Sequence, residues 1–261
     1  MTEVDLKKAK KIAEGVAVEV GKLLQENIDK VKEVRKKGAR DFVTNLDVEA
    51  EEMIISAIEK EFSDHSIVGE EGDVKDKGSD YTWVIDPLDG TMNYIHAHPP
   101  FRVGIGLLYK NKPVLSVLYN PVKGNLYSAI KGHGATLNGK KIETTKHLSL
   151  SESLVMTHLS SKKTPRLRTI LALENIFNNA MQIRIMGSGL ASMSYVAHGK
   201  YDVFFNVSTS VWDIIPAVCL IEEAGGKVTD IDGNEITLAS TSVLATNGRV
   251  HKKMLELLEN V

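Results

Sequence analysis

Apolar residues recur at every third or fourth position in the first part of the chain, which predicts two amphipathic helices. The first helix places Lys and Glu between a set of apolar residues on one face: Ile12, Val16, Val20, Leu23, Leu24, Ile28 and Val31. The second repeats the pattern over residues 54–62. Its beginning resembles a capping box, Thr44-Asn45-Leu46-Asp47, with Asp in the fourth position where Glu or Gln is commoner.

The spacing of apolar residues changes after the second helix and becomes typical of strands. Residues 65–69 and 82–86 are short strand candidates, and residues 101–130 contain three β-rich runs. Turn residues separate these runs at Lys110-Asn111 and at Lys123-Gly124-Asn125. Such short connections predict an antiparallel meander.

Strand and helix candidates alternate after about Ile142, which predicts a mixed α/β region. The expected strands are Leu154–His158, Ala180–Met186, Tyr201–Asn206, Lys227–Ile231 and Val243–Thr246. The expected helices are Arg166–Asn178, Ser188–His198, Val211–Glu223 and Val250–Leu258. The sequence contains no Pro- or Ser-rich linker and no repeat. We therefore expect an N-terminal α+β half (residues 1–142) and a C-terminal α/β half (residues 143–261) that share one core and one cleft.

Composition and charge narrow the possible functions. A chain of 261 residues can bury a sizeable core, and its net charge of −2 gives no basic field for nucleic acid or an anionic membrane. An anionic substrate would therefore need a local source of positive charge. The N-terminus lacks the apolar segment of a signal peptide, and no apolar run approaches the ~20 residues of a membrane span. The single cysteine, Cys219, lies in an apolar run, so we expect a buried thiol and a cytoplasmic protein.

Acidic residues gather where apolar runs end. Asp86 directly follows an expected strand, and Pro87, which has no N–H for a sheet, should stop that strand. Asp89 follows three residues later, and Gly90 and Thr91 offer backbone N–H groups to an anion. Carboxylates this close suit Mg²⁺, with Mn²⁺ as a substitute, and no His or Cys competes in the segment. Alternatively, the two aspartates only form a turn.

Three further acidic residues occupy similar positions. Glu70 and Glu71 follow the strand candidate 65–69, and Asp213 follows Trp212 at the start of an expected helix. Each lies at a boundary between apolar and polar sequence, which is typical of groups at the mouth of a cleft. Alternatively, the two glutamates are a solvated charge pair, and Asp213 interacts with the helix dipole.

Together these segments resemble the inositol monophosphatase family over nearly the whole chain. Residues 83–94 with His96 are similar to its first signature, and 41–47 to its Asp-x-Val-Thr-x-x-Asp element. Residues 69–71 are similar to its Gly-Glu-Glu element, and 212–226 to its second signature, in which Ile215 replaces a small residue. The resemblance implies an α+β fold, a layered αβαβα sandwich of the sugar phosphatase type, with an antiparallel sheet half and a mixed α/β half.

The resemblance also implies a Mg²⁺-dependent phosphomonoester phosphatase and assigns its metal ligands. Glu70, Asp86 and the Leu88 carbonyl would hold one metal ion. Asp86, Asp89 and Asp213 would hold a second, and Glu70 would reach a third through water. Mg²⁺ would supply the positive charge that the chain as a whole lacks.

Catalytic roles follow from the same resemblance. Gly90 and Thr91 would donate backbone N–H groups to the phosphate. Thr91 and Glu70 would orient the attacking water, with Asp47 hydrogen-bonded to Thr91. Asp47 also remains a candidate for the capping box, and the two roles are compatible.

Substrate recognition would involve residues 187–189, Asn206 and Asp213. Gly187, Ser188 and Gly189 imitate a dinucleotide loop but lack its third glycine. They better match the family's Gly-Ser/Thr-Ala segment beside the substrate alcohol, with Gly189 in place of Ala. Asn206 stands where inositol-specific members commonly carry a Glu that binds a hydroxyl.

The expected partner is a small phosphorylated substrate, an inositol or sugar phosphate, and inositol monophosphate is the first expected substrate. The alternatives are a fructose-1,6-bisphosphatase and an NADP or 3′-nucleotide phosphatase. From other classes, a non-catalytic regulatory protein and a nicotinamide-dependent oxidoreductase are kept as alternatives. The resemblance further implies a homodimer and inhibition by Li⁺.

Overall fold

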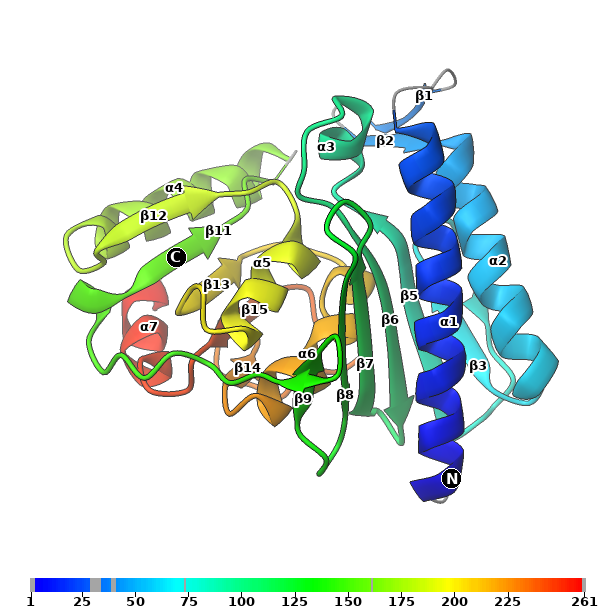
Figure 1. The fold of residues 1–261 in the computed structure, drawn as a ribbon. Helices are drawn as coiled ribbons and strands as arrows, with labels where there is room; N and C mark the ends of the chain where they lie inside the picture. The colour runs from blue at the N-terminus through cyan, green and yellow to red at the C-terminus, as the bar shows by residue number, and fades with distance from the viewer. Residues whose placement is uncertain (1–2, 29–33, 39–40, 73, 161, 260–261) are drawn as a thin grey trace.

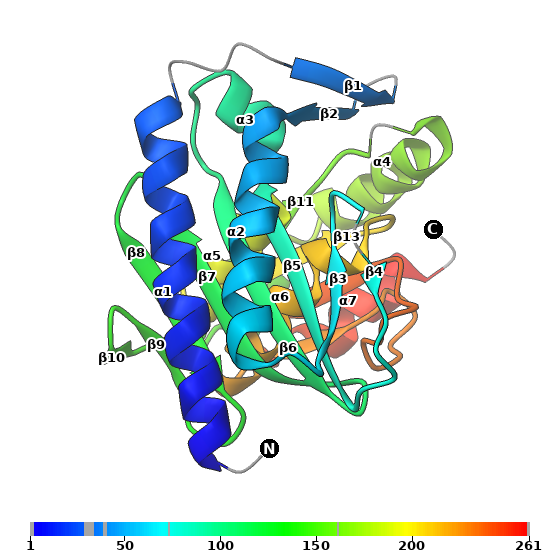
Figure 2. The same ribbon diagram turned by 90° about the vertical axis from the view of Figure 1, so that its right-hand side faces the viewer.

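The chain folds into alternating layers of helices and sheets (Figures 1 and 2). The computed structural model describes residues 3–28, 34–38, 41–72, 74–160 and 162–259. Helices α1 (Glu3–Asn27) and α2 (Asn45–Glu61) cover one face of an eight-stranded sheet. Helices α5 (Gly189–Ala197) and α6 (Ile215–Glu223) lie between this sheet and a five-stranded one. Helices α4 (Lys163–Phe177) and α7 (His251–Leu258) cover the outer face of the smaller sheet, so the expected αβαβα sandwich is confirmed.

The first helix is held to the sheet by its small and aliphatic residues. Val20 and Leu24 are fully buried in a cluster with residues of α2 and of the larger sheet. Gly21 lies against the Tyr119 ring, and a Cβ at this glycine would come within 2.2 Å of a ring carbon. The helix therefore approaches the sheet closely only with glycine there. Val31 and the Thr44 side chain of the expected capping box lie outside the described residues. Of the helices in the described part of the chain, none is long and apolar enough to cross a membrane.

The larger sheet has the strand order β10-β9-β8-β7-β6-β5-β3-β4. Its strands are β3 (Ser66–Gly69), β4 (Val74–Lys75), β5 (Tyr81–Asp89), β6 (Arg102–Tyr109), β7 (Lys112–Asn120), β8 (Asn125–Ile130), β9 (Ala135–Leu137) and β10 (Lys140–Lys141). Strands β6, β7 and β8 are consecutive antiparallel neighbours, which confirms the expected meander. Strand β3 pairs with β5 in parallel, so the polypeptide after β3 and the end of β5 meet at one edge.

The expectation that Pro87 ends its strand is wrong. Strand β5 continues to Asp89, although its pairing with β6 skips a residue. Asp86 lies opposite Gly104 and Asp89 lies opposite Arg102, so two residues of β5 face a single residue of β6. This bulge accommodates proline, because a bulged residue needs no ladder hydrogen bond.

The smaller sheet has the strand order β12-β11-β13-β15-β14 and contains all five strands expected after residue 142. They are β11 (Leu154–Thr157), β12 (Gln182–Ile185), β13 (Val203–Asn206), β14 (Lys227–Thr229) and β15 (Val243–Thr246), each within its expected range. Strand β11 pairs in parallel with β12 and with β13.

Four shorter elements complete the described chain. They are a hairpin of β1 (Val34–Gly38) and β2 (Asp41–Thr44), helix α3 (Thr91–Ile95), and the 3₁₀ turns η1 (Leu150–Glu152) and η2 (Val211–Asp213). The single helix expected over Val211–Glu223 is therefore wrong. It is divided into η2 and α6, because Pro216 lies in the first turn of α6 and begins a new helix.

Among the described residues, three apolar clusters make up the core, and the middle one joins the two sheets. It contains Val84 and Leu118 of the larger sheet together with Leu190 and Cys219 of the inner helices. Cys219 is buried as expected, and burial raises the pKa of its thiol. The boundary between the halves at residue 142 stays a prediction.

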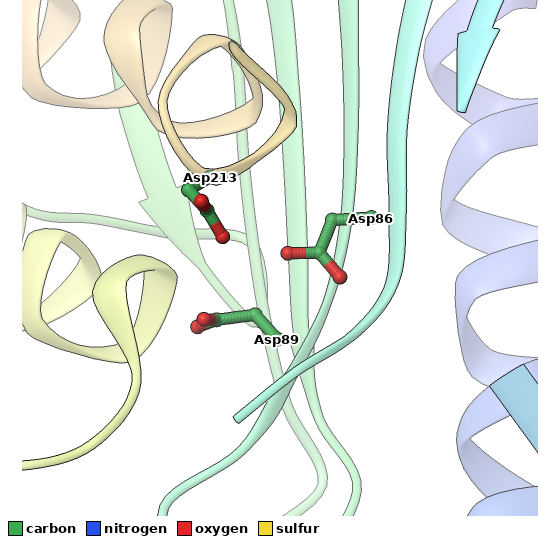
Figure 3. A group of neighbouring side chains, drawn as sticks. All are labelled: Asp86, Asp89 and Asp213. Carbon is green, nitrogen blue, oxygen red and sulfur yellow. The ribbon is translucent and has the colours of Figure 1, made fainter. Parts of the chain in front are cut away.

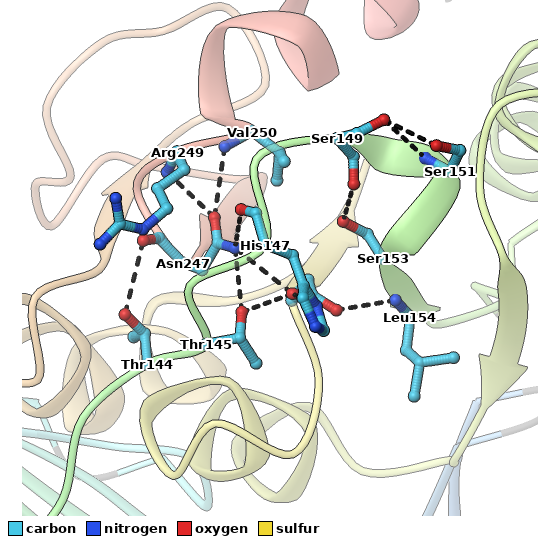
Figure 4. A network of polar contacts seen from close by, with 11 residues as sticks. Thr144, Thr145, His147, Ser149, Ser151, Ser153, Leu154, Asn247, Arg249 and Val250 are labelled. Atoms are coloured by element: carbon cyan, nitrogen blue, oxygen red, sulfur yellow. Dashed lines mark hydrogen bonds and ion pairs between the residues drawn. The ribbon is translucent and has the colours of Figure 1, made fainter.

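A polar network fixes the segment that leads from the larger sheet to the smaller one (Figure 4). Its acceptor is the buried Asp202 carboxylate, which receives hydrogen bonds from Thr145 Oγ1, His147 Nδ1 and the Leu154 backbone N–H. Asn247 Nδ2 donates to the same carboxylate over 3.3 Å. Residues 145–147, Leu154 and Asn247 are thus all tied to the carboxylate of Asp202.

Candidate active site

Three aspartates converge where the larger sheet meets the inner helices (Figure 3). Asp86 and Asp89 flank the bulge of β5, and Asp213 ends η2. One carboxylate oxygen from each lies within 4.8 Å of the others. Asp86 Oδ1 accepts a hydrogen bond from the Leu88 N–H at 3.1 Å, whereas Asp86 Oδ2 is buried and has no partner among the described residues. A buried carboxylate that lies beside two others and has an oxygen without a donor fits a hard divalent cation.

Electrostatic repulsion makes this cluster costly without a cation. Burial raises the pKa of Asp86 well above its usual value, and the charges of Glu70, Asp89 and Asp213 raise it further. Burial and the Asp213 charge raise the pKa of Asp89 to about 6, although hydrogen bonds oppose the shift. A bound cation would reverse these shifts, because opposite charge favours the ionised form.

Asp89 is attached to the beginning of α5. The Ser188 hydroxyl donates to Asp89 Oδ2, and the Leu190 N–H donates to the same oxygen at 2.8 Å. The Gly189 N–H donates to Asp89 Oδ1 at 3.0 Å, and the Ala191 N–H to Oδ2 at 3.3 Å. The carboxylate therefore faces the positive end of a helix, which holds its orientation.

The loop before α5 is held in place by Asn93. Its amide donates to the Met186 carbonyl at 2.9 Å and to the Pro100 carbonyl at 2.7 Å. Gly187 has φ of 74°, and a Cβ there would come within 2.8 Å of Asn93 Oδ1. Glycine is therefore required at position 187 both by its backbone conformation and by its neighbour.

Thr91 begins α3 beside the aspartates. Its hydroxyl lies 3.3 Å from Asp47 Oδ1 and 3.2 Å from the Leu88 carbonyl oxygen, and it can donate to either. The hydrogen bond expected between Asp47 and Thr91 is therefore present. Gly90 precedes the helix with φ of 93°, and Gly90 and Thr91 both line the cleft beside the aspartates.

Glu51 was not expected from the sequence, although it holds the backbone beside Glu70. Its side chain is buried, and Glu51 Oε2 accepts a hydrogen bond from the Glu71 N–H at 2.9 Å. A Cβ on Gly69 would come within 2.5 Å of this carboxylate, so glycine is needed for the approach. The sequence did contain one indication of this role: Glu51 is a carboxylate on the apolar face of α2, one turn after Asp47.

A cleft of about 340 Å³ opens beside the aspartates. Its lining includes these expected residues: Glu70, Asp89, Gly90, Thr91, Gly187, Gly189, Asn206 and Asp213. Asp86, Leu88, Asp47 and Ser188 do not line it and act from behind the surface. The lining also includes residues that sequence reasoning missed: Met92, His158, Ser160, Lys162, Phe204, Ser208, Thr209, Ser210 and Trp212.

Asp213 is oriented by the loop that precedes it. Thr209 Oγ1 donates to Asp213 Oδ2 at 2.7 Å, and the Ser210 N–H donates to it at 3.1 Å. Asp213 therefore interacts with the start of η2, as a partner of the helix dipole would, and it also faces Asp86 and Asp89, as a metal ligand would. The two interpretations of this residue each describe part of its contacts. Burial lowers the pKa of nearby His158, and the Asp213 charge opposes that shift.

Known proteins share this sequence and arrangement. The sequence profile of the inositol monophosphatase family matches residues 5–261. Phosphatase IMPL1 of Arabidopsis thaliana chloroplasts is 35% identical over 242 residues, which are 90% of this chain and 65% of that protein. Nus factor SuhB of Escherichia coli K12 is 35% identical over 248 residues, which are 94% of this chain and 93% of that protein.

Solved structures agree with the sequence comparison. The inositol monophosphatase of Thermotoga maritima superposes with a TM-score of 0.87 and 31% identity, over 99% of this chain and 97% of that one. The suppressor protein SuhB of Bartonella henselae gives a TM-score of 0.92 and 27% identity, over 97% and 99% of the two chains. The chain therefore belongs to the inositol monophosphatase family.

Proposed function

We propose that the protein is a Mg²⁺-dependent phosphatase of small phosphate monoesters, with inositol monophosphate as the first candidate substrate. One observation carries the proposal: the buried Asp86 carboxylate, whose Oδ2 has no hydrogen-bond partner among the described residues, has an oxygen within 4.8 Å of carboxylate oxygens of Asp89 and Asp213. The cluster adjoins a cleft that also presents Gly90 and Thr91. Relatives named as phosphatases support the reaction type.

Metal binding would use the acidic cluster and the backbone beside it. Glu70, Asp86 and the Leu88 carbonyl would hold one cation, and Asp86, Asp89 and Asp213 a second. These cations would neutralise the phosphoryl oxygens and make an attacking water molecule more acidic. Mn²⁺ would be an acceptable substitute, because it prefers the same oxygen ligands.

The chain's own groups would position the phosphate and the water. Gly90 and Thr91 would donate backbone N–H groups to the phosphoryl oxygens. The Thr91 hydroxyl directs its proton to Asp47 or to the Leu88 carbonyl, so its lone pairs are free to accept a hydrogen bond from water. Glu70 would accept the proton that this water loses on attack.

The substrate alcohol would lie near residues 187–189. Ser188 would act through Asp89, because its hydroxyl donates to that carboxylate. Gly187 and Gly189 would let the alcohol approach the backbone, and Asn206 and Asp213 would contact its hydroxyl groups. A reducing, cytoplasmic setting stays a prediction.

Phosphate release from inositol 1-phosphate tests the proposal. Release should require Mg²⁺, resume with Mn²⁺ and decrease in millimolar LiCl. Asp89→Asn should lower kcat by about 10³-fold or more at an unchanged fold, because metal-assisted charge stabilisation is lost. Fructose 1,6-bisphosphate, NADP and 3′-phosphoadenosine 5′-phosphate serve as alternative substrates. Absence of release from every ester would refute the phosphatase function.

We further propose that a second copy of the chain covers the surface formed by α4 and β12. Several large apolar side chains are exposed there: Leu167, Ile170, Leu171, Phe177, Met181 and Ile185. Strand β12 is also an edge strand, which can pair antiparallel with its own copy about a twofold axis. Phe177 is 74% exposed, so Phe177→Glu should convert a dimer to a monomer in sedimentation analysis. A monomeric unmodified protein would refute this assignment.

A further inference from the structure

The cleft lining outside the acidic cluster presents hydrogen-bond donors. His158, Lys162 and Asn206 belong to this lining, and we call these three residues the donor wall. Strands β11 and β13 pair in parallel with Thr157 opposite Phe205. His158 and Asn206 are the next residues along these neighbouring strands, so they leave the sheet at the same level. Two adjacent strand ends thus carry His158 and Asn206, and Lys162 lies directly before α4.

Asn206 offers a hydrogen-bond donor at a position where the Glu of inositol-specific family members would offer only acceptors. Its side chain is 5% exposed, and its Oδ1 accepts a hydrogen bond from the Ser208 N–H at 3.2 Å. The carbonyl oxygen of the amide is thus engaged, and its NH₂ group is the part left for a ligand. A group that accepts hydrogen bonds suits this position better than one that must donate.

His158 adds a second donor that the protein itself does not use. Within the described part of the chain, no hydrogen-bond partner is found for its imidazole. The histidine lines the cleft and is half-buried. A neutral imidazole still carries one N–H, and a polar group buried in this way favours a ligand that completes its hydrogen bonding.

Lys162 supplies positive charge at the same wall. It is the one cationic side chain among the described residues that line the cleft, and no described carboxylate is paired with it. Its backbone is fixed, because the Lys162 N–H donates to Ser160 Oγ at 3.2 Å. Arg166 Nε donates to the Ser160 carbonyl at 2.9 Å, which holds the same turn. The ammonium group of Lys162 is therefore free to bind a ligand, whereas the backbone that carries it is fixed.

We infer that the donor wall binds a second anionic group of the substrate, given that the proposed phosphatase function holds. The preferred substrate would then be a sugar or polyol that carries a second phosphate besides the ester that is cleaved. Amide, imidazole and ammonium donors complement phosphate oxygens, and none of the three residues offers a carboxylate to repel them. A cleft of about 340 Å³ lies within the range of small-ligand sites.

Two esters that differ only in the distal phosphate test the inference. The ratio of kcat/KM for fructose 1,6-bisphosphate to that for fructose 1-phosphate should be about 10 or more in the unmodified protein. Lys162→Gln should lower this ratio by about tenfold, because one charge-assisted contact is lost. Lys163→Gln is the matched control, since Lys163 is exposed, adjacent and outside the cleft lining. It should leave the ratio unchanged.

Lys162 could instead attract all anionic substrates without contacting the distal phosphate, and this explanation predicts a different result for Lys162→Gln. It would lower kcat/KM for both esters equally, and an unchanged ratio in Lys162→Gln would overturn the inference. A ratio near one in the unmodified protein would also overturn it. Asn206→Glu adds an independent variant, in which a carboxylate should repel the distal phosphate and lower the ratio further. Its unfolding temperature shows whether the variant folds.

A binding measurement separates this inference from the proposed function. Calorimetric titration of Asp89→Asn with the two fructose esters in Mg²⁺ needs no turnover. Tighter binding of the bisphosphate, reduced by adding Lys162→Gln, supports the donor wall even if no ester is hydrolysed. Equal binding of the two esters overturns it even if inositol 1-phosphate is hydrolysed.

Discussion

Replacing Asp86 by Asn should stabilise the metal-free protein at neutral pH and abolish its activity. Asp86 is fully buried, and burial together with three neighbouring carboxylates raises its pKa well above 3.8. Asparagine keeps the oxygen that accepts the Leu88 N–H, and it replaces Asp86 Oδ2, which has no partner. The substitution therefore removes a repelled charge and keeps the hydrogen bond from the Leu88 N–H.

The structure sets an upper limit for this gain. A carboxyl that ionises at 3.8 when unfolded but stays protonated when folded destabilises the protein by ~1.4 kcal/mol for each pH unit above 3.8. At pH 7 the free energy of unfolding is thereby lowered by at most about 4 kcal/mol. The destabilisation grows as pH rises, because the unfolded state releases its proton first. We expect Asp86→Asn to raise the free energy of unfolding by up to about 4 kcal/mol near pH 7 and by almost nothing near pH 4.

Urea unfolding in EDTA, followed by the fluorescence of buried Trp83, measures this gain across the pH range. Asp232→Asn, at an exposed position, is the matched control and should change little. Saturating Mg²⁺ should reverse the order of stability, because only the unmodified cluster binds the cation strongly. A metal-free Asp86→Asn protein less stable than the unmodified one at neutral pH would refute the reasoning. A gain of equal size near pH 4 would refute it as well.

Three further predictions concern other parts of the molecule. Asp202→Ala should lower the free energy of unfolding by about 3–5 kcal/mol, because several donors lose the buried carboxylate that accepts their hydrogen bonds; urea unfolding checks this against Asp232→Asn. Gly21→Ala should destabilise by about 1–3 kcal/mol through the clash with Tyr119, seen as a lower unfolding temperature. Thr91→Val should lower kcat by about 10²-fold or more with KM nearly unchanged, because the hydroxyl that orients water is lost; steady-state kinetics measures both constants.

Local patterns predicted the elements of the fold well where one face of each element is buried. In the meander strands and in α5, apolar residues recur with the period of a strand or of a helix. Their local sequence and their tertiary packing therefore favour the same structure. Pro87 and Pro216 show where local rules failed. Pro87 is accommodated by a bulge that depends on the register of β6, and Pro216 starts a new helix after the turn that holds Asp213. Both outcomes depend on neighbours that the local sequence does not specify.

The sequence predicted the acidic part of the candidate site and, within the donor wall, only Asn206. Asp86 and Asp89 lie at the end of one strand, so a short segment contains the signal. His158 and Lys162 meet Asn206 only because β11 and β13 pair in parallel across almost fifty residues of sequence. A lone histidine or lysine carries no pattern of its own, and only the sheet register brings these residues to one cleft.

The attachment of Asp89 to α5 has a consequence for how metal affinity can change. The oxygens that would bind a cation also accept hydrogen bonds from Ser188, Gly189 and Leu190. The helix and the cation thus compete for the electron density of one carboxylate. Each donor removed from the loop would make Asp89 a more basic ligand, and each donor added would weaken it. Substitutions in the residues before α5 can therefore change the affinity for the cation while every metal ligand stays the same.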